Sequence, residues 1–188
     1  HLNNAPAAHK EEGANSMIFL TEGDSAAGSI SKTRDSNYQA VFALRGKILN
    51  VQGKNRTELY KNEELYNIMV ALGIEESIEN LRYGKVVIAT DADVDGYHIR
   101  ILLMTYFFSY FEDIIRQGRL FILETPLFRV RNKKQTVYCY TEKERDEALE
   151  KIRGAEVTRF KGLGEINPNE FGPFIGKDIR LVPVTFES

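Results

Sequence analysis

The chain has 188 residues, with 25 Lys and Arg against 27 Asp and Glu, and a formal net charge of −2. This balance gives no global sign of nucleic-acid binding, so a basic surface has to be local. Cys139 is the only cysteine, which excludes an internal disulfide and fits a reducing compartment. No apolar run is long enough for a membrane span and no signal peptide is visible, so we expect no membrane partner.

The start of the chain is polar and then becomes a strand. Residues 1–15 are rich in Ala and Asn, and we expect a mobile lead. Because the chain does not begin with Met, we expect a fragment of a longer protein. The apolar run Met17–Leu20 predicts a short strand. The small residues within Thr21–Ser29 then favour a tight strand-to-helix turn, with a helix over Ala27–Lys32.

Glu22 follows the first predicted strand at its carboxyl end. A glutamate there can be a metal ligand, a general acid or a general base. An ordinary helix start is the alternative, with Asp24 or Ser25 as N-cap, and both interpretations can hold together. The motif Glu-Gly-Asp-Ser is a weak signal by itself, and it gains weight from a second acidic motif downstream.

The middle of the chain alternates strands and helices. Short apolar runs predict strands, and apolar residues at helical spacing predict helices. This alternation indicates a parallel α/β sheet flanked by helices. The predicted elements are a strand over Gln39–Leu44, a helix over Asn62–Leu72 ended by Gly73, a strand over Lys85–Thr90, a helix over His98–Ile115 and a strand over Leu120–Leu123.

The pattern changes after Pro126, which suggests a domain boundary. Leu127–Arg131 and Thr136–Tyr140 predict a β-hairpin with the basic loop Asn132–Gln135. A capping-box start at Thr141 predicts a helix that runs to about Arg153, and Asn167-Pro168 predicts another helix start. We therefore divide the chain into a lead, an α/β domain and a smaller α+β tail, over residues 1–15, 16–125 and 126–188.

An acidic motif, Thr90-Asp91-Ala92-Asp93-Val94-Asp95-Gly96, follows the strand at Lys85. If the chain stays extended, Asp91, Asp93 and Asp95 point the same way. Three carboxylates on one side repel one another unless a cation neutralises them. A solvated acidic turn is the alternative, but a turn has no need for acids at alternate positions. We expect a hard divalent metal.

Two kinds of site fit Asp-x-Asp-x-Asp-Gly. An EF-hand calcium loop opens in this way, but its twelfth position would be Leu102 instead of Glu, and a strand precedes it. A magnesium site at the carboxyl end of a parallel strand fits better, because ligands bind at that edge. A phosphatase-type Asp nucleophile stays open from this motif alone.

Two basic turns accompany the acids. Arg45-Gly46-Lys47 ends a strand, and Arg159 and Lys161 stand next to Gly162 and Gly164. Glycines beside cations allow close approach to a ligand, so these turns can meet a phosphate backbone. Taken singly, each is an ordinary solvated turn. The Walker A spacing is absent, which argues against nucleotide hydrolysis in this segment.

Four motifs in this order closely resemble those of the bacterial type IIA topoisomerases. The resemblance is to the C-terminal part of their B subunit, in gyrase or topoisomerase IV, which is a Toprim domain with a tail, and it covers about residues 16 to 175. The motifs are Glu22–Ala26, Leu44–Asn50, Asp91–Arg100 and Lys161–Glu165.

The resemblance implies a role for each site residue. Glu22, Asp91 and Asp93 would hold the catalytic Mg²⁺, with Asp93 and Asp95 offering a second position, and Mn²⁺ or Ca²⁺ could substitute in binding. Glu22 would also exchange a proton with the leaving 3′ oxygen. The positions expected to contact DNA are Arg45, Lys47 and Lys161, and those expected to border the site of quinolone-like poisons are Asp24 and Lys47.

The resemblance also implies partners. The family cleaves both strands of double-stranded DNA with a tyrosine of the A subunit, in an A2B2 heterotetramer in the bacterial cytoplasm. Its ATPase module precedes this region, so ATP would act only through that module, and we expect the isolated chain to be inactive. Two other classes stay as alternatives: a Mg²⁺-dependent α/β phosphohydrolase with Asp91 as nucleophile, and a non-catalytic metal-bearing DNA-binding module.

Overall fold

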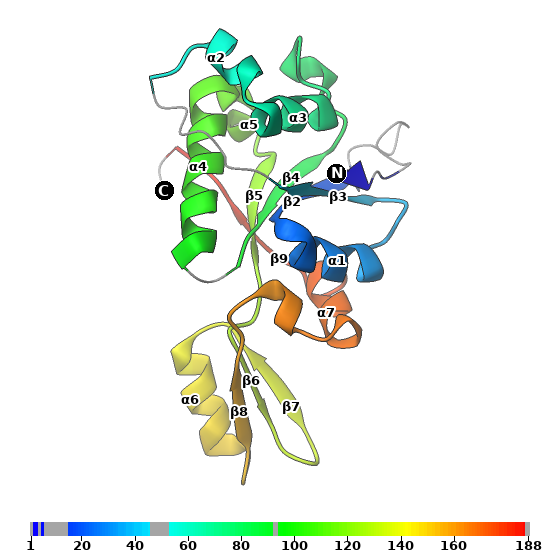
Figure 1. Ribbon diagram of the computed structural model, residues 1–188. Helices are drawn as coiled ribbons and strands as arrows, with labels where there is room; N and C mark the ends of the chain where they lie inside the picture. The colour runs from blue at the N-terminus through cyan, green and yellow to red at the C-terminus, as the bar shows by residue number, and fades with distance from the viewer. Residues whose placement is uncertain (1, 4, 6–14, 46–52, 92–93, 187–188) are drawn as a thin grey trace.

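Four parallel strands form the centre of a six-stranded sheet in the computed structural model (Figure 1). The structure describes residues 2–3, 5, 15–45, 53–91 and 94–186. The strand order is β1-β3-β2-β4-β5-β9, with antiparallel pairing only at the two edges. The predicted parallel α/β sheet is therefore confirmed. The strands are β1 (Leu2–Asn3), β2 (Met17–Glu22), β3 (Gln39–Leu44), β4 (Lys85–Ala89), β5 (Leu120–Glu124) and β9 (Arg180–Pro183).

Helices cover both faces of this sheet (Figure 1). Side chains alternate along each strand, so Ile18 and Leu20 pack into one core cluster and Phe19 packs into the other. Strands buried on both faces read as continuous apolar runs, which is why the sequence indicated them. The first cluster lies under α2 (Arg56–Lys61), α3 (Glu63–Leu72), α4 (Val94–Tyr110) and α5 (Glu112–Arg116), and the second lies under α1 (Gly23–Thr33) and α7 (Pro168–Ile175).

Several boundaries differ from the predicted ones. Helix α1 begins at Gly23, so the N-cap is Glu22 and not Asp24 or Ser25. Helix α4 begins at Val94 and not at His98. The long helix is broken at Phe111, whose φ of −137° and ψ of 44° are not helical. The strand β1 and the buried Ala5 were not expected, and the rest of the predicted mobile lead up to residue 14 lies outside the described residues.

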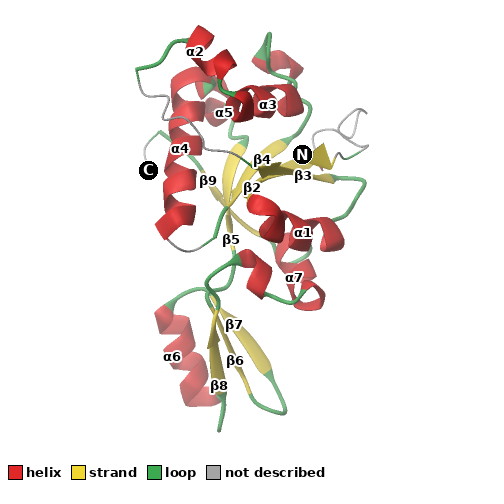
Figure 2. Ribbon diagram, in the orientation of Figure 1, coloured by secondary structure: helices red, strands yellow, loops and turns green. Residues whose placement is uncertain are grey.

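A three-stranded antiparallel sheet with one helix forms a smaller subdomain (Figure 2). The predicted hairpin is confirmed, and so is the capping box, in which Thr141 and Glu144 bond each other's backbone. A third strand, which the sequence did not predict, completes the sheet in the order β7-β6-β8. The elements are β6 (Phe128–Arg131), β7 (Thr136–Cys139), α6 (Glu142–Lys151) and β8 (Glu156–Arg159), around a core of Phe128, Val130, Cys139, Ala148 and Ile152.

The chain after this subdomain returns to the main sheet, where α7 packs against α1 and β9 pairs with β5. Glu170 on α7 ties the two parts together. Its carboxylate accepts two bonds of 2.9 Å from Arg129 Nη1 and one from the Tyr138 hydroxyl. The hydrogen bond from Tyr138 and the charge of Arg129 hold the pKa of Glu170 below its ordinary value. The region predicted as a tail, 126–188, thus contains the small subdomain and also α7 and β9, which pack with the main sheet.

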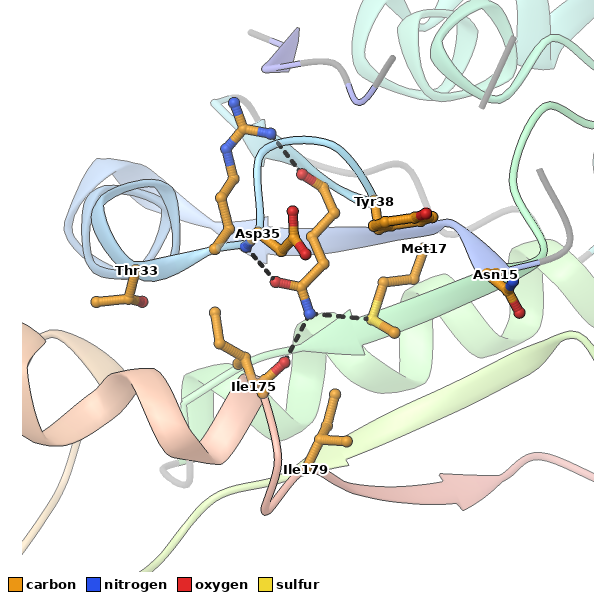
Figure 3. A pocket seen from close by; sticks show the side chains of 10 residues that line it. Asn15, Met17, Thr33, Asp35, Tyr38, Ile175 and Ile179 are labelled. Atoms are coloured by element: carbon orange, nitrogen blue, oxygen red, sulfur yellow. Dashed lines mark hydrogen bonds between the residues drawn. The ribbon is translucent and has the colours of Figure 1, made fainter. Parts of the chain in front are cut away.

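At the amino ends of the parallel strands, a cavity of about 460 Å³ lies between α1, β3 and α7 (Figure 3). The side chain of Gln39 spans it. Its Nε2 donates to the carbonyl of Ile175 at 2.6 Å and to Met17 Sδ at 3.6 Å, while its Oε1 accepts from the Asp35 amide at 2.8 Å. Because Gln39 is only 6% exposed, these bonds replace lost water and fix the end of α7 to the sheet.

Candidate metal centre at the carboxyl edge of the sheet

Three of the predicted site residues lie at the carboxyl ends of adjacent parallel strands. Strand β2 lies between β3 and β4, and it ends at Glu22. Asp91 follows the end of β4, and Arg45 follows the end of β3. The register aligns Glu22 with Leu44 and Thr21 with Ala89, so the three strands end level with one another. This edge is where open α/β sheets bind ligands.

Glu22 is the N-cap of α1 but makes no side-chain capping hydrogen bond. The tight turn after it depends on Gly23, whose φ of +71° lies in the left-handed region that favours glycine. The carboxylate of Glu22 is half-buried at the centre of the edge. The strand end therefore places Glu22 at the centre of the edge, and its side chain does not cap the helix.

Asp91 is held from the opposite direction by the segment that contains the Lys-Gly-Leu-Gly-Glu motif. Its Oδ1 accepts a hydrogen bond of 2.8 Å from the backbone N–H of Leu163, in the short 3₁₀ helix η4 (Leu163–Glu165). A Cβ on Gly162 would lie 3.2 Å from Asp91 Oδ2, which is tighter than an ordinary contact, so a larger residue there would require a shift of a few tenths of an ångström. The motif thus contacts a candidate metal ligand directly, far along the chain from it.

The remaining acids are arranged differently from the expected extended run. Asp95 lies exposed in the first turn of α4, because the chain has already entered the helix at Val94. The premise that Asp91, Asp93 and Asp95 alternate along one strand therefore does not hold at Asp95. Asp93 lies outside the described residues. Within the described ranges, no three His, Cys, Asp or Glu side chains converge on a common position for an ion.

Two of the predicted basic residues, Arg45 and Lys161, are described, and an acid accepts a hydrogen bond from the backbone of each. The Arg45 amide donates to Glu64 Oε2 at 3.0 Å, which anchors the backbone at the end of β3 and leaves the arginine exposed. The Lys161 amide donates to Glu165 Oε2 at 2.7 Å, so the Glu165 side chain stabilises the loop in which both residues lie. The side chain of Lys161 is exposed beside the Asp91 contact. Lys47 and the side chain of Asp24 lie outside the described residues.

Sequence reasoning missed two features of this edge. The first is the hydrogen bond from the Leu163 amide to Asp91, which no side-chain pattern marks because the donor is a backbone group. The available signal was Gly162, the glycine before it, which allows a close approach. Thr90, which is 4% exposed, has a buried hydroxyl without a hydrogen-bond partner among the described residues. His98, considered as a DNA contact or a packed residue, lies exposed on α4.

The fold is an α/β domain with a mainly parallel sheet, and two candidate metal ligands, Glu22 and Asp91, lie at the carboxyl edge of that sheet. Residues 17–125 match the model of the Toprim domain. The chain belongs to the Toprim family. No helix in the described ranges has both the length and the apolar character to cross a membrane.

The relatives of this chain belong to topoisomerases, which confirms the resemblance seen in the motifs. The chain is 66% identical over 170 residues to the B subunit of DNA topoisomerase 4 from Borreliella burgdorferi, covering 90% of this chain and 28% of that protein. It is 43% identical over 177 residues to the B subunit of DNA gyrase from Thermotoga maritima, covering 90% and 27%. The chain therefore spans about a quarter of the length of these curated relatives.

A solved structure agrees over nearly the whole chain. It is the crystal structure of the Plasmodium falciparum topoisomerase II DNA-binding, cleavage and re-ligation domain, with a TM-score of 0.84 and 29% identity. The match covers 96% of this chain and 27% of the solved one. The likeness thus includes the small subdomain as well as the sheet.

Proposed function

We propose that this chain is the metal-bearing half of the DNA cleavage and religation centre of an ATP-dependent type IIA topoisomerase. The observation that carries the proposal is the pairing of Glu22 and Asp91 at adjacent strand ends, in a chain whose relatives are the B subunits of topoisomerases. The identity of 66% with the topoisomerase 4 protein, against 43% with the gyrase protein, favours the topoisomerase IV type.

The donor set suits Mg²⁺. Magnesium is bound by one or two carboxylates together with waters and substrate phosphates. Glu22 and Asp91 supply two hard oxygen donors at one edge, and Asp91 uses Oδ1 for the Leu163 amide, which leaves Oδ2 for a cation. Asp93 and Asp95 would offer a second position, and Mn²⁺ or Ca²⁺ could substitute. When bound, Mg²⁺ would stabilise the charge on the cleaved phosphate and on the leaving 3′ oxygen.

The residues of this chain would hold and orient the reacting groups. The Leu163 amide fixes the direction of the Asp91 carboxylate. Glu22, at the centre of the edge, would give a proton to the 3′ oxygen on cleavage and take it back on religation. Arg45, Lys47 and Lys161 would hold the DNA backbone. Asp24 and Lys47 would border a pocket for quinolone-like poisons in the cleaved complex.

The other parts of the enzyme would lie outside this chain. The attacking tyrosine would belong to an A subunit, in an A2B2 heterotetramer on double-stranded DNA. ATP would act only through an N-terminal module of the B subunit. We place this assembly in the bacterial cytoplasm, at the nucleoid.

The test is cleavage of a supercoiled plasmid by this chain mixed with the A subunit of a topoisomerase IV. We expect Mg²⁺-dependent double-strand cleavage from the mixture and none from either chain alone. Asp91→Asn should reduce cleavage by at least about 100-fold, the scale seen when one electrostatic catalytic group is removed. Asp113→Asn is the matched control, since Asp113 is an exposed acid on α5, away from the edge.

Three outcomes would contradict the proposal. One is DNA cleavage by the isolated chain. Another is full cleavage by the mixture containing the Asp91 variant. The third is Mg²⁺-dependent hydrolysis of p-nitrophenyl phosphate by the chain alone, lost in the same variant, because that would make Asp91 the nucleophile of a phosphohydrolase.

A further inference from the structure

A basic hollow is lined by residues of the β6–β7 turn and of the segment after α6. This turn lies at the end of the small subdomain that is far from the main sheet (Figure 1). We define it by its five cations, Arg131, Lys133, Lys134, Lys151 and Arg153. The hollow has a volume of about 810 Å³, and Glu156 is the one acid among the residues that line it.

The charge of this hollow is balanced only in part within the described residues, by Glu156, which lies opposite Arg131 in the β6–β8 register. All five cationic residues are exposed, and within the described part of the chain none of them forms an ion pair with a carboxylate. The chain as a whole is slightly acidic, with a net charge of −2. Five cations around one hollow are therefore a local segregation of charge, and they repel one another until an anion enters.

The hollow is also held in shape by Asn132. Its Oδ1 accepts from the amides of Lys134 at 2.8 Å and Gln135 at 3.0 Å, which fixes the hairpin turn. Its Nδ2 donates to the carbonyl of Arg153 at 3.0 Å, which ties this turn to the loop after α6. The side chains of Lys133 and Lys134 take no part in these bonds. The cations thus project from a preorganised backbone.

Helix stability accounts for only part of this arrangement. Lys151 lies in the last turn of α6, where a cation interacts favourably with the helix dipole. Arg131 lies opposite Glu156 on the neighbouring strand, where opposite charges stabilise the sheet. The two lysines of the hairpin turn have neither role. The placement of Lys133 and Lys134 beside the other cations is therefore better explained by an external anion.

The lining indicates which kind of anion. A protein partner is usually anchored by apolar or aromatic side chains in a dry centre. The hollow offers none, because every lining residue is charged, an amide or glycine. Duplex DNA presents one phosphate charge for about every 1.7 Å of helix axis and needs only cations to bind.

We infer that the basic hollow binds the phosphodiester backbone of double-stranded DNA, as a second contact separate from the candidate metal centre. It would bind without regard to base sequence and without a metal ion. The inference goes beyond the proposed function, which places DNA only at the carboxyl edge of the sheet.

The experiment is fluorescence anisotropy of a labelled duplex of about 20 base pairs, titrated with the chain in EDTA from about 50 to 200 mM salt. The variant is Lys133→Gln with Lys134→Gln, which leaves the backbone bonds of the turn in place. Each phosphate contact contributes about 0.9 to the slope of log affinity against log salt, so the slope should fall by about 1.8. This is about 60-fold in affinity at 0.1 M salt, if the salt-independent part is unchanged.

The matched control is Lys143→Gln with Lys177→Gln, which removes the same charge from exposed lysines outside the hollow. The control should keep most of the slope, and both variants should keep the melting temperature of the wild type. Equal slopes for the two variants would overturn the inference, as would no duplex binding by the wild type. Binding of poly-glutamate that depends on Lys133 and Lys134, with no such dependence for the duplex, would assign the hollow to an acidic polypeptide instead. Because no metal is present, the result is independent of the cleavage test of the proposed function.

Discussion

Replacing Gly162 by alanine tests the contact between the glycine-rich segment and the candidate metal ligand. The new Cβ would lie 3.2 Å from Asp91 Oδ2, 3.3 Å from Cγ and 3.4 Å from Oδ1. These distances are too short for comfortable contact, so the carboxylate or the loop has to move by a few tenths of an ångström. Either movement weakens the 2.8 Å bond from the Leu163 amide, because Leu163 is the next residue.

The size of the effect follows from that bond. A hydrogen bond to a charged group contributes about 1.5 to 3 kcal/mol, which corresponds to about 10- to 150-fold in an equilibrium constant. We therefore expect Gly162→Ala to weaken the apparent affinity for Mg²⁺ by about this factor, with a similar loss of cleavage in the presence of an A subunit.

Isothermal titration calorimetry of Mg²⁺ into the chain measures this loss. Gly172→Ala is the matched control, since a Cβ there meets Thr33 at an ordinary 3.7 Å in helix α7. If Gly162→Ala bound Mg²⁺ within about twofold of the wild type while its melting temperature stayed the same, the reasoning that this segment orients Asp91 would be refuted.

Three further predictions concern stability. Gly96→Ala places a Cβ 2.0 Å from the carbonyl oxygen of Asp91, so urea unfolding should show a loss of about 1 to 3 kcal/mol or more. Gln39→Leu leaves the buried carbonyl of Ile175 without its donor, and the free energy of unfolding should fall by about 1 to 3 kcal/mol. The pKa of Glu170 is lowered in the folded protein, so its contribution is full above the ordinary glutamate pKa of about 4.3 and is lost as the pH falls through the lower folded value. Glu170→Gln should thus lower the melting temperature at pH 7, and the difference from the wild type should narrow as the pH falls below about 4. A constant difference down to about pH 2 would contradict the assignment.

The strands of the main sheet could be predicted because they are buried on both faces and read as apolar runs. The edge strands β1, β8 and β9 gave no such signal, whereas the edge strand β7 was predicted as half of a hairpin. Strand β8 has exposed residues such as Val157, and β9 has exposed residues such as Arg180 and Val182, so neither alternates clearly. Their pairing depends on partners far along the chain, which no local pattern reports. The helix that was predicted as continuous to Ile115 is apolar on nearly all sides, so its periodicity could not reveal the break at Phe111.

The site was predictable to the extent that it depends on strand ends. Glu22 and Asp91 end neighbouring strands, and the alternation of strands and helices placed them at one edge. The expected alignment of Asp95 with Asp91 was wrong, because the prediction assumed an extended chain up to Asp95, whereas α4 already begins at Val94. The support of Asp91 by Leu163 could not be predicted, because it joins a side chain to a backbone amide across a long separation in sequence.

The two connections between the sheet and the small subdomain run side by side, and the Phe160 amide bonds the carbonyl of Leu127 at 2.8 Å where they meet. The second connection leads within a few residues to Gly162 and Leu163, which contact Asp91. The small subdomain therefore joins the main sheet next to Asp91, a candidate metal ligand. A load on its tip would be transmitted to the acid through this short segment, while the bonds of Glu170 to Arg129 and Tyr138 resist rotation. If a duplex binds at the basic hollow as inferred, a force on that end of the molecule would thereby bear on the position of Asp91 at the other end.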